Sequence, residues 1–332
     1  MRKTKDCESE YLNVPCGVCS ECVAKRQMFL VQRVRSMSLD NYIFFITLTY
    51  NNESLPKLTT STDVTISYAD IADVQKMFKR IRKINPFNRQ LSYLFVSERG
   101  KERGRPHFHG LLFLKKLESD DDLTPAQLEP SVRRLIFKEW RRNYGSTRVP
   151  IWKPLFTFHS KIVAGKIYQN FDCHYVVPHS TEHGSDDVAF YVSKYILKPS
   201  IKEERLQQAL KLNLKEEEFE DIWSKVRSKC FFSKHFGALS DLQIKYVKSC
   251  ISRSVDNPSG FQYFTQDGTP QPLARYYMKY VGLEEGLKSA QSKGSPLSID
   301  DRSLSEKDRS ISKGSFIKEK VSQRDISELF TD

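Results

Sequence analysis

The sequence predicts an α+β fold in which helices pack against an antiparallel sheet. Residues 42–50 (YIFFITLTY) are aromatic and β-branched, as expected of a central strand. Residues 68–84 carry apolar side chains at helical spacing, with Lys and Arg on the other face. Residues 91–98 and 107–114 flank a charged turn that contains glycine, and they therefore predict a β-hairpin.

The remaining elements follow in order along the chain. A basic helix over 24–37 precedes the first strand, and residues 51–67 are expected to form a polar loop. A second basic helix covers 130–144, a strand lies within 167–177, and a final helix covers 186–197. From the first strand onward, the order strand, helix, strand, strand, helix, strand matches the ferredoxin-like arrangement.

Composition divides the chain into four segments. Residues 1–37 form a cysteine-containing segment with a basic helix, and residues 38–200 hold the predicted α+β domain. Residues 201–287 predict a partly helical extension. Residues 288–332 are rich in Ser, Lys and Asp and poor in aromatic residues, which predicts a disordered tail.

The charge balance indicates a polyanionic partner. The 332 residues include 53 Lys and Arg against 41 Asp and Glu, giving a formal charge of +12 and a pI near 9.2. Nucleic acid is the first candidate partner and an acidic membrane the second. No apolar stretch is long enough to span a bilayer, and the charged N-terminus does not match a signal peptide. We therefore expect a cytoplasmic protein without a membrane partner.

The PHFHG motif at 106–110 carries the clearest chemistry. Side chains alternate along a strand, so His107 and His109 share one face and predict a pair of metal ligands. Any antiparallel hairpin register whose facing residues have an odd sum, for example 98 opposite 109, places Glu98 on that face. A slip of one residue would instead leave Glu98 as a solvated strand end. Such a ligand set suits first-row transition metals well and Mg²⁺ or Mn²⁺ moderately.

A repeated Tyr-x-x-Lys pattern provides candidate nucleophiles. Tyr191 and Tyr195 are four residues apart and so share one helix face, and Lys194 and Lys198 each follow a tyrosine by three residues. A tyrosine oxygen can attack phosphorus and hold DNA covalently, and a lysine can steer the phosphate. The same spacing is typical of an ordinary amphipathic helix, and the histidine hairpin upstream favours the catalytic interpretation.

Four cysteines near the N-terminus leave two interpretations open. Cys16, Cys19 and Cys22 are spaced at intervals of three, with Cys7 upstream. They could form a structural Zn²⁺ site, or they could be reduced thiols at the start of a helix. The bacterial iron–sulfur pattern fits less well, because it requires a further Cys followed by Pro.

Three motifs together resemble those of HUH endonucleases: FITLTY at 45–50, PHFHG at 106–110 and YVSKYILK at 191–198. More narrowly, they resemble those of the rolling-circle replication initiators of gokushovirus-type microviruses, which are small single-stranded DNA phages. The segment PCGVCSECVAKR at 15–26 is similar to the same subgroup. The resemblance implies an RRM-like, ferredoxin-like HUH nuclease domain over 38–200.

The resemblance also implies site roles and partners. Its metal ligands would be His107, His109 and Glu98, its nucleophiles Tyr191 and Tyr195, and its assisting lysines Lys194 and Lys198. The implied activity is Mg²⁺- or Mn²⁺-dependent nicking of single-stranded origin DNA through a 5′-phosphotyrosine, in the cytoplasm of the host cell. No Walker-type phosphate loop occurs, so a host helicase and polymerase are the expected partners. The alternatives are a relaxase, a single-strand transposase, or a non-catalytic nucleic-acid-binding protein.

Overall fold

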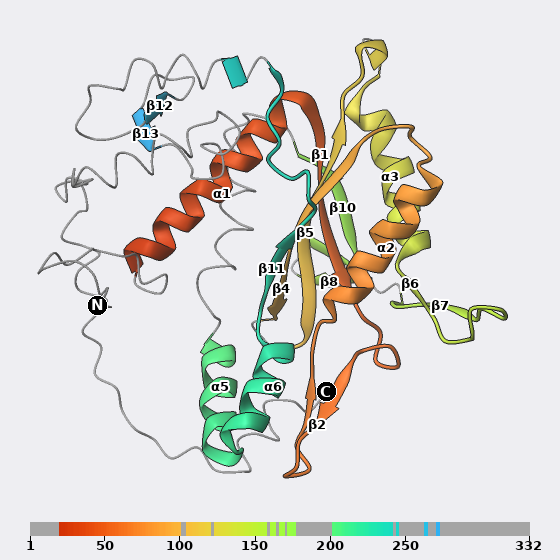
Figure 1. Ribbon diagram of the computed structural model, residues 1–332. Helices are drawn as coiled ribbons and strands as arrows, with labels where there is room; N and C mark the ends of the chain where they lie inside the picture. The colour runs from red at the N-terminus through yellow and green to blue at the C-terminus, as the bar shows by residue number, and fades with distance from the viewer. Residues whose placement is uncertain are drawn as a thin grey trace, which may run out of the picture.

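The computed structural model (Figure 1) describes residues 20–100, 104–120, 123–157, 160–163, 166–169, 171–176, 201–241, 244–245, 262–264 and 270–272. Its helices and antiparallel sheet confirm the predicted α+β class. The main sheet has five strands, and every neighbouring pair is antiparallel. In spatial order these strands are β10 (Asp172–Tyr175), β1 (Asn41–Thr49), β5 (Pro106–Lys115), β4 (Leu91–Arg99) and β11 (Cys230–Phe232).

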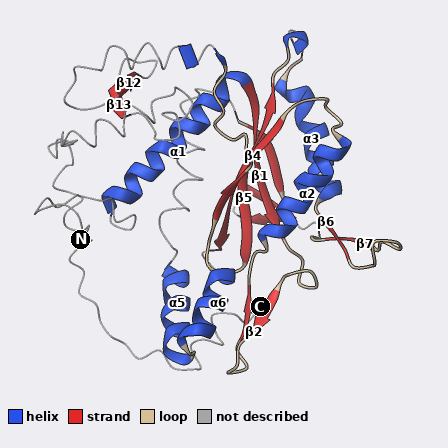
Figure 2. Cartoon of the chain, viewed as in Figure 1, coloured by secondary structure: helices blue, strands red, loops and turns tan. Residues whose placement is uncertain are grey.

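Helices cover both faces of this sheet (Figure 2). The helices α2 (Ile71–Ile84) and α3 (Pro125–Glu139) pack on one face, and α1 (Ser20–Asp40) packs on the other. Alternation along β1 decides which side chains meet which helices. Phe44, Ile46 and Leu48 lie in the core under α2 and α3, whereas Ile43 and Phe45 lie in the core under α1.

The sequence defines α2 closely. Its buried side chains Val74, Met77, Phe78 and Ile81 recur at helical spacing. The Asp70 side chain accepts a hydrogen bond from the Ala72 N–H at 2.9 Å, so the helix starts at Ile71. The predicted start at Tyr68 was therefore three residues too early.

Gly110, the last residue of the PHFHG motif, allows β4 and β5 to pack closely. It faces Phe95 across the hairpin, and a Cβ at this position would lie 2.4 Å from the Phe95 ring. The ring therefore covers the glycine. Phe95 also contacts Phe78 of α2, with ring centroids 5.5 Å apart, so the same ring links the hairpin to the core.

Two sequence predictions on either side of the hairpin were wrong. Residues 51–67 are not only a loop, because they contain the short strands β2 (Lys57–Thr59) and β3 (Thr65–Ser67). The helix predicted over 130–144 is α3 and begins at Pro125. Proline is favoured in the first turn of a helix, and the Thr124 N–H donates to the Gln127 side chain at 2.8 Å.

Further elements complete the described part of the chain. Between α3 and β10 lie four short strands: β6 (Arg141–Asn143), β7 (Trp152–Pro154), β8 (Ser160–Val163) and β9 (Lys166–Gln169). The others are η1 (Glu118–Asp120), α5 (Ile201–Asn213), α6 (Glu216–Val226), β12 (Gln262–Phe264) and β13 (Pro270–Pro272). Among the described residues, no helix combines the length and apolar character needed to cross a bilayer.

The segment after residue 200 contributes to the main sheet. Residues 201–229 were expected to be helical and charged, and most of them form α5 and α6. These helices share an apolar cluster with Ile66 of β3. The chain then enters β11, which pairs with β4 and places Phe231 6.2 Å from the Phe95 ring. The sequence had not predicted this strand.

Candidate metal centre

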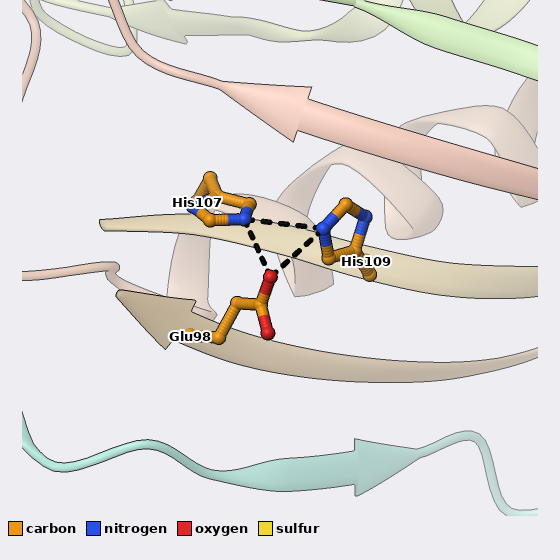
Figure 3. Close-up of side chains that lie close together, drawn as sticks. All are labelled: Glu98, His107 and His109. Carbon is orange, nitrogen blue, oxygen red and sulfur yellow. Dashed lines mark hydrogen bonds and ion pairs between the residues drawn. The ribbon is translucent and has the colours of Figure 1, made fainter. Parts of the chain in front are cut away.

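The register of the β4–β5 hairpin determines where Glu98 lies. Glu98 faces His107 and Val96 faces His109, so facing residues have an odd sum, as predicted. The example of residue 98 opposite residue 109 was two residues off, which leaves the face unchanged. Glu98, His107 and His109 therefore project from neighbouring strands toward one point (Figure 3). We call these three residues the His–Glu cluster.

The three donor atoms have the separations that a divalent ion requires. His107 Nε2 lies 2.7 Å from Glu98 Oε1, His109 Nε2 lies 2.9 Å from the same oxygen, and the two Nε2 atoms are 3.1 Å apart. Ligands about 2.1 Å from an ion and at right angles to each other stand about 3.0 Å apart. The donor set therefore fits a divalent cation without rearrangement.

Contacts behind the rings orient both histidines. His107 Nδ1 lies 3.0 Å from the Arg105 carbonyl oxygen, which can only accept, so Nδ1 carries a proton and donates it. His109 Nδ1 lies 3.0 Å from Thr47 Oγ1 in β1. Metal-binding histidines are commonly held in this way, through the nitrogen that faces away from the ion.

The charge distribution requires a cation at the centre of the cluster. With Nδ1 protonated, a neutral His107 directs a lone pair at the Glu98 carboxylate, so a proton or a metal ion must lie between them. Burial raises the pKa of Glu98, but hydrogen bonds and positive charge from both histidines outweigh it and lower this pKa to about 2. Burial chiefly lowers the pKa of His109, which favours the neutral form that binds metals.

The cluster remains open to a ligand. The exposed fractions of the side chains are 15% for His107 and 11% for both His109 and Glu98. A partly buried site of this kind strengthens electrostatic interactions while leaving a direction of approach for a substrate phosphate.

Thr47 is a site residue whose role the sequence analysis did not assign. It faces His109 in the β1–β5 register, and the same register places Thr49 opposite His107. Strand alternation along 45–50 puts both threonines on one face, so the signal was present in the sequence. Only the pairing of β1 with β5 shows that this face is the histidine face.

A Thr47→Val variant is expected to bind Mn²⁺ about 10- to 100-fold more weakly than the wild-type protein, because His109 loses its partner at Nδ1 while the side-chain volume is retained. Isothermal titration calorimetry with Mn²⁺ measures the change. Thr59→Val, an exposed change on β2, is the matched control and should leave the affinity unaltered. Equal affinities for the two variants would exclude this role for Thr47.

A second histidine pair was also missed. His174 Nδ1 lies 3.1 Å from Asp172 Oδ2, and in the β1–β10 register Asp172 faces Thr47. The Phe45 ring lies between the two histidine positions, with its centroid 5.5 Å from that of His109 and 5.2 Å from that of His174. The hydrogen bond to Asp172 is the main cause of a raised pKa for His174. The DCHY sequence has the same one-residue spacing as the PHFHG motif.

Several predicted site residues lie outside the described residues. They are Tyr191, Lys194, Tyr195, Lys198, Cys7, Cys16 and Cys19. Cys22 lies in α1 and is half-buried. The predicted helix over 186–197 and the predicted tail over 288–332 also fall outside this part of the chain.

Comparison with known proteins identifies the class to which this fold and site correspond. A sequence model of the replication-associated protein ORF2 family matches residues 43–200, a range that includes the His–Glu cluster. The chain is also 31% identical over 113 residues to the replication-associated protein ORF4 of Chlamydia phage 1. That alignment covers 34% of this chain and 27% of the phage protein, so the chain matches about a quarter of its relative's length. No solved structure matches.

The matched region is thus similar to replication-associated proteins as a class. More particularly, the predicted resemblance to a rolling-circle replication initiator of microviruses is confirmed by the family match and the phage relative.

Proposed function

We propose that this protein initiates rolling-circle replication by nicking single-stranded origin DNA in a metal-dependent reaction. The observation that carries the proposal is the His–Glu cluster, whose three donor atoms converge within the region similar to replication-associated proteins. The basic net charge supports a nucleic-acid substrate. The strand order β10-β1-β5-β4, with α2 and α3 on one face, supports the ferredoxin-like HUH domain.

The residues of the cluster would hold a divalent cation, with Mg²⁺ or Mn²⁺ proposed. Such a cation polarises a scissile phosphate and neutralises charge that develops on it. Glu98 supplies an ionised carboxylate, and His107 and His109 supply nitrogen ligands that Arg105 and Thr47 orient. The sheet therefore presents the ligand set in a fixed arrangement before DNA binds.

Tyr191 and Tyr195 are the proposed nucleophiles. The phenolic oxygen would form a bond to phosphorus while the bond from phosphorus to the 3′ oxygen breaks, and the phenolic proton would leave with the freed 3′ hydroxyl or solvent. Lys194 and Lys198 would steer the phosphate and stabilise the phenolate. The resulting 5′-phosphotyrosine conserves the bond energy, so a later attack by a 3′ hydroxyl rejoins the strand without another energy source. A host helicase and polymerase would open and copy the duplex.

A covalent adduct is the expected product when the protein meets an end-labelled single-stranded origin DNA with Mn²⁺. The adduct should survive a denaturing gel, disappear with a chelator, and be lost in the Tyr191→Phe/Tyr195→Phe double variant, because no phenolic oxygen remains to attack. Tyr68→Phe is the control for loss of a tyrosine elsewhere. Cleavage without an adduct, or an adduct in the double variant, would refute the nucleophile assignment. Tight binding without cleavage would instead support a non-catalytic binding protein.

A further inference from the structure

The β6–β7 ribbon, residues 141–154, projects from the sheet as a two-stranded arm (Figure 1). Four of its residues are basic and none is acidic. The basic residues are Arg141, Arg142, Arg148 and Lys153. The stretch without acidic residues continues from Glu139 to Asp172. A surface with charges of one sign attracts a polyanion.

The outer part of the ribbon is exposed even though it carries large apolar side chains. The exposed fractions are 48% for Tyr144, 68% for Val149, 52% for Ile151 and 40% for Trp152. Single exposed apolar residues are common on protein surfaces. A group of them beside cations, however, indicates a surface that binds a partner.

Hydrogen bonds within the ribbon fix the shape of its tip. The Asn143 side-chain oxygen accepts from the Gly145 N–H at 2.9 Å and from the Ile151 N–H at 2.8 Å. The Ser146 hydroxyl accepts from the Val149 N–H at 2.9 Å. The arm is therefore preorganised, which reduces the entropy lost on binding.

The root of the ribbon is attached beside the His–Glu cluster. The buried Trp140 side chain donates from Nε1 to the Thr49 carbonyl oxygen at 2.8 Å, and the Asn51 N–H donates to the Leu155 carbonyl oxygen at 2.7 Å. Thr49 faces His107 in the β1–β5 register. The arm thus leaves the sheet at the end that carries the cluster.

The aromatic rings of the ribbon hold cations. Arg80 and Arg141 lie 5.0 and 4.7 Å from the Trp152 ring centroid, and Arg142 and Lys153 each lie 5.7 Å from that of Tyr144. Rings occupied in this way order the cations instead of offering free platforms for unpaired bases. This arrangement favours contact with phosphates over stacking with a single strand.

We propose that the β6–β7 ribbon binds duplex DNA beside the nicking site, with its strands in the major groove and its cations on the flanking phosphates. The major groove is wide enough to admit a two-stranded β-ribbon. This assignment rests on the proposed function, since it places the duplex next to the single strand that the cluster would engage.

The Arg148→Ala/Lys153→Ala double variant tests the arm, because neither residue belongs to the cluster. The probe is a fluorescent DNA hairpin with a single-stranded tail, titrated by anisotropy in chelator so that nicking plays no part. We expect its affinity to fall about tenfold near 0.15 M salt, and the slope of log K against log salt to shrink by about 2, because two phosphate contacts are lost. The Lys57→Ala/Lys234→Ala double variant removes the same charge at exposed sites and should retain most of the affinity.

Three results would overturn the assignment. The first is an equal loss of affinity in the arm and control variants, which would indicate a non-specific charge effect. The second is an equal loss for the hairpin and for the tail alone, which would indicate a single-strand contact. The third is unchanged DNA binding, which would assign the arm to a protein partner. Nicking of the tail alone should persist in the arm variant. Absence of nicking in the wild-type protein counts against the proposed function without affecting the duplex measurement.

Discussion

The His109→Ala variant is expected to lose divalent-metal binding by about 100-fold or more and to leave origin DNA uncut. Removal of an orienting contact alone costs 10- to 100-fold in such sites, and loss of a ligand costs at least as much. His109 Nε2 lies within 3.1 Å of both other donor atoms, so its loss leaves two ligands where the cluster has three. Calorimetry with Mn²⁺ measures the affinity, and the denaturing gel measures nicking.

The control for this prediction is His235→Ala. His235 is exposed and belongs to the segment after β11, so its removal should change neither Mn²⁺ affinity nor nicking. Far-UV circular dichroism should be the same for both variants, because His109 contributes to the site and not to the main aromatic core. Retained nicking by a folded His109→Ala protein would show that the cluster is not the metal site of the reaction.

Local rules were enough to predict the His–Glu cluster from the sequence. Alternation within one strand puts His107 and His109 on one face, and a short hairpin permits only two parities for Glu98. The wrong parity would have placed Glu98 in the apolar layer where Phe108 is fully buried. The prediction therefore depended on only one undetermined choice, which the structure settles in favour of the histidine face.

Elements that depend on distant partners could not be predicted in the same way. The strand β11 has three residues and is defined by its pairing with β4, more than a hundred residues earlier in the chain. The strands β6 and β7 are equally short, and β6 consists of Arg141, Arg142 and Asn143, which have little β propensity. The orienting role of Thr47 required knowledge that β1 lies beside β5. Tertiary pairing supplied this information, and no local pattern contained it.

A Gly110→Ala variant is expected to lower the free energy of unfolding by about 1–3 kcal/mol, the usual range for overpacking a well-packed core. The added Cβ would lie 2.4 Å from the fully buried Phe95 ring, which has no free space to enter. Urea denaturation followed by circular dichroism measures the change. Displacement of β5 from β4 would also separate the histidines from Glu98, so Mn²⁺ affinity should fall together with stability.

Gly100→Ala provides a matched control in the same hairpin. A Cβ at Gly100 would have its nearest contact at 3.6 Å, which is ordinary van der Waals distance, so stability should hardly change. The cause can be tested further with Phe95→Leu, which shortens the ring side chain that meets the new Cβ. If the clash is responsible, Gly110→Ala should cost less in the Phe95→Leu background than in the wild-type protein. Strictly additive effects would mean that Gly110 serves the backbone of β5 for some other reason, and that the close packing of Phe95 on the histidine motif does not position the metal ligands.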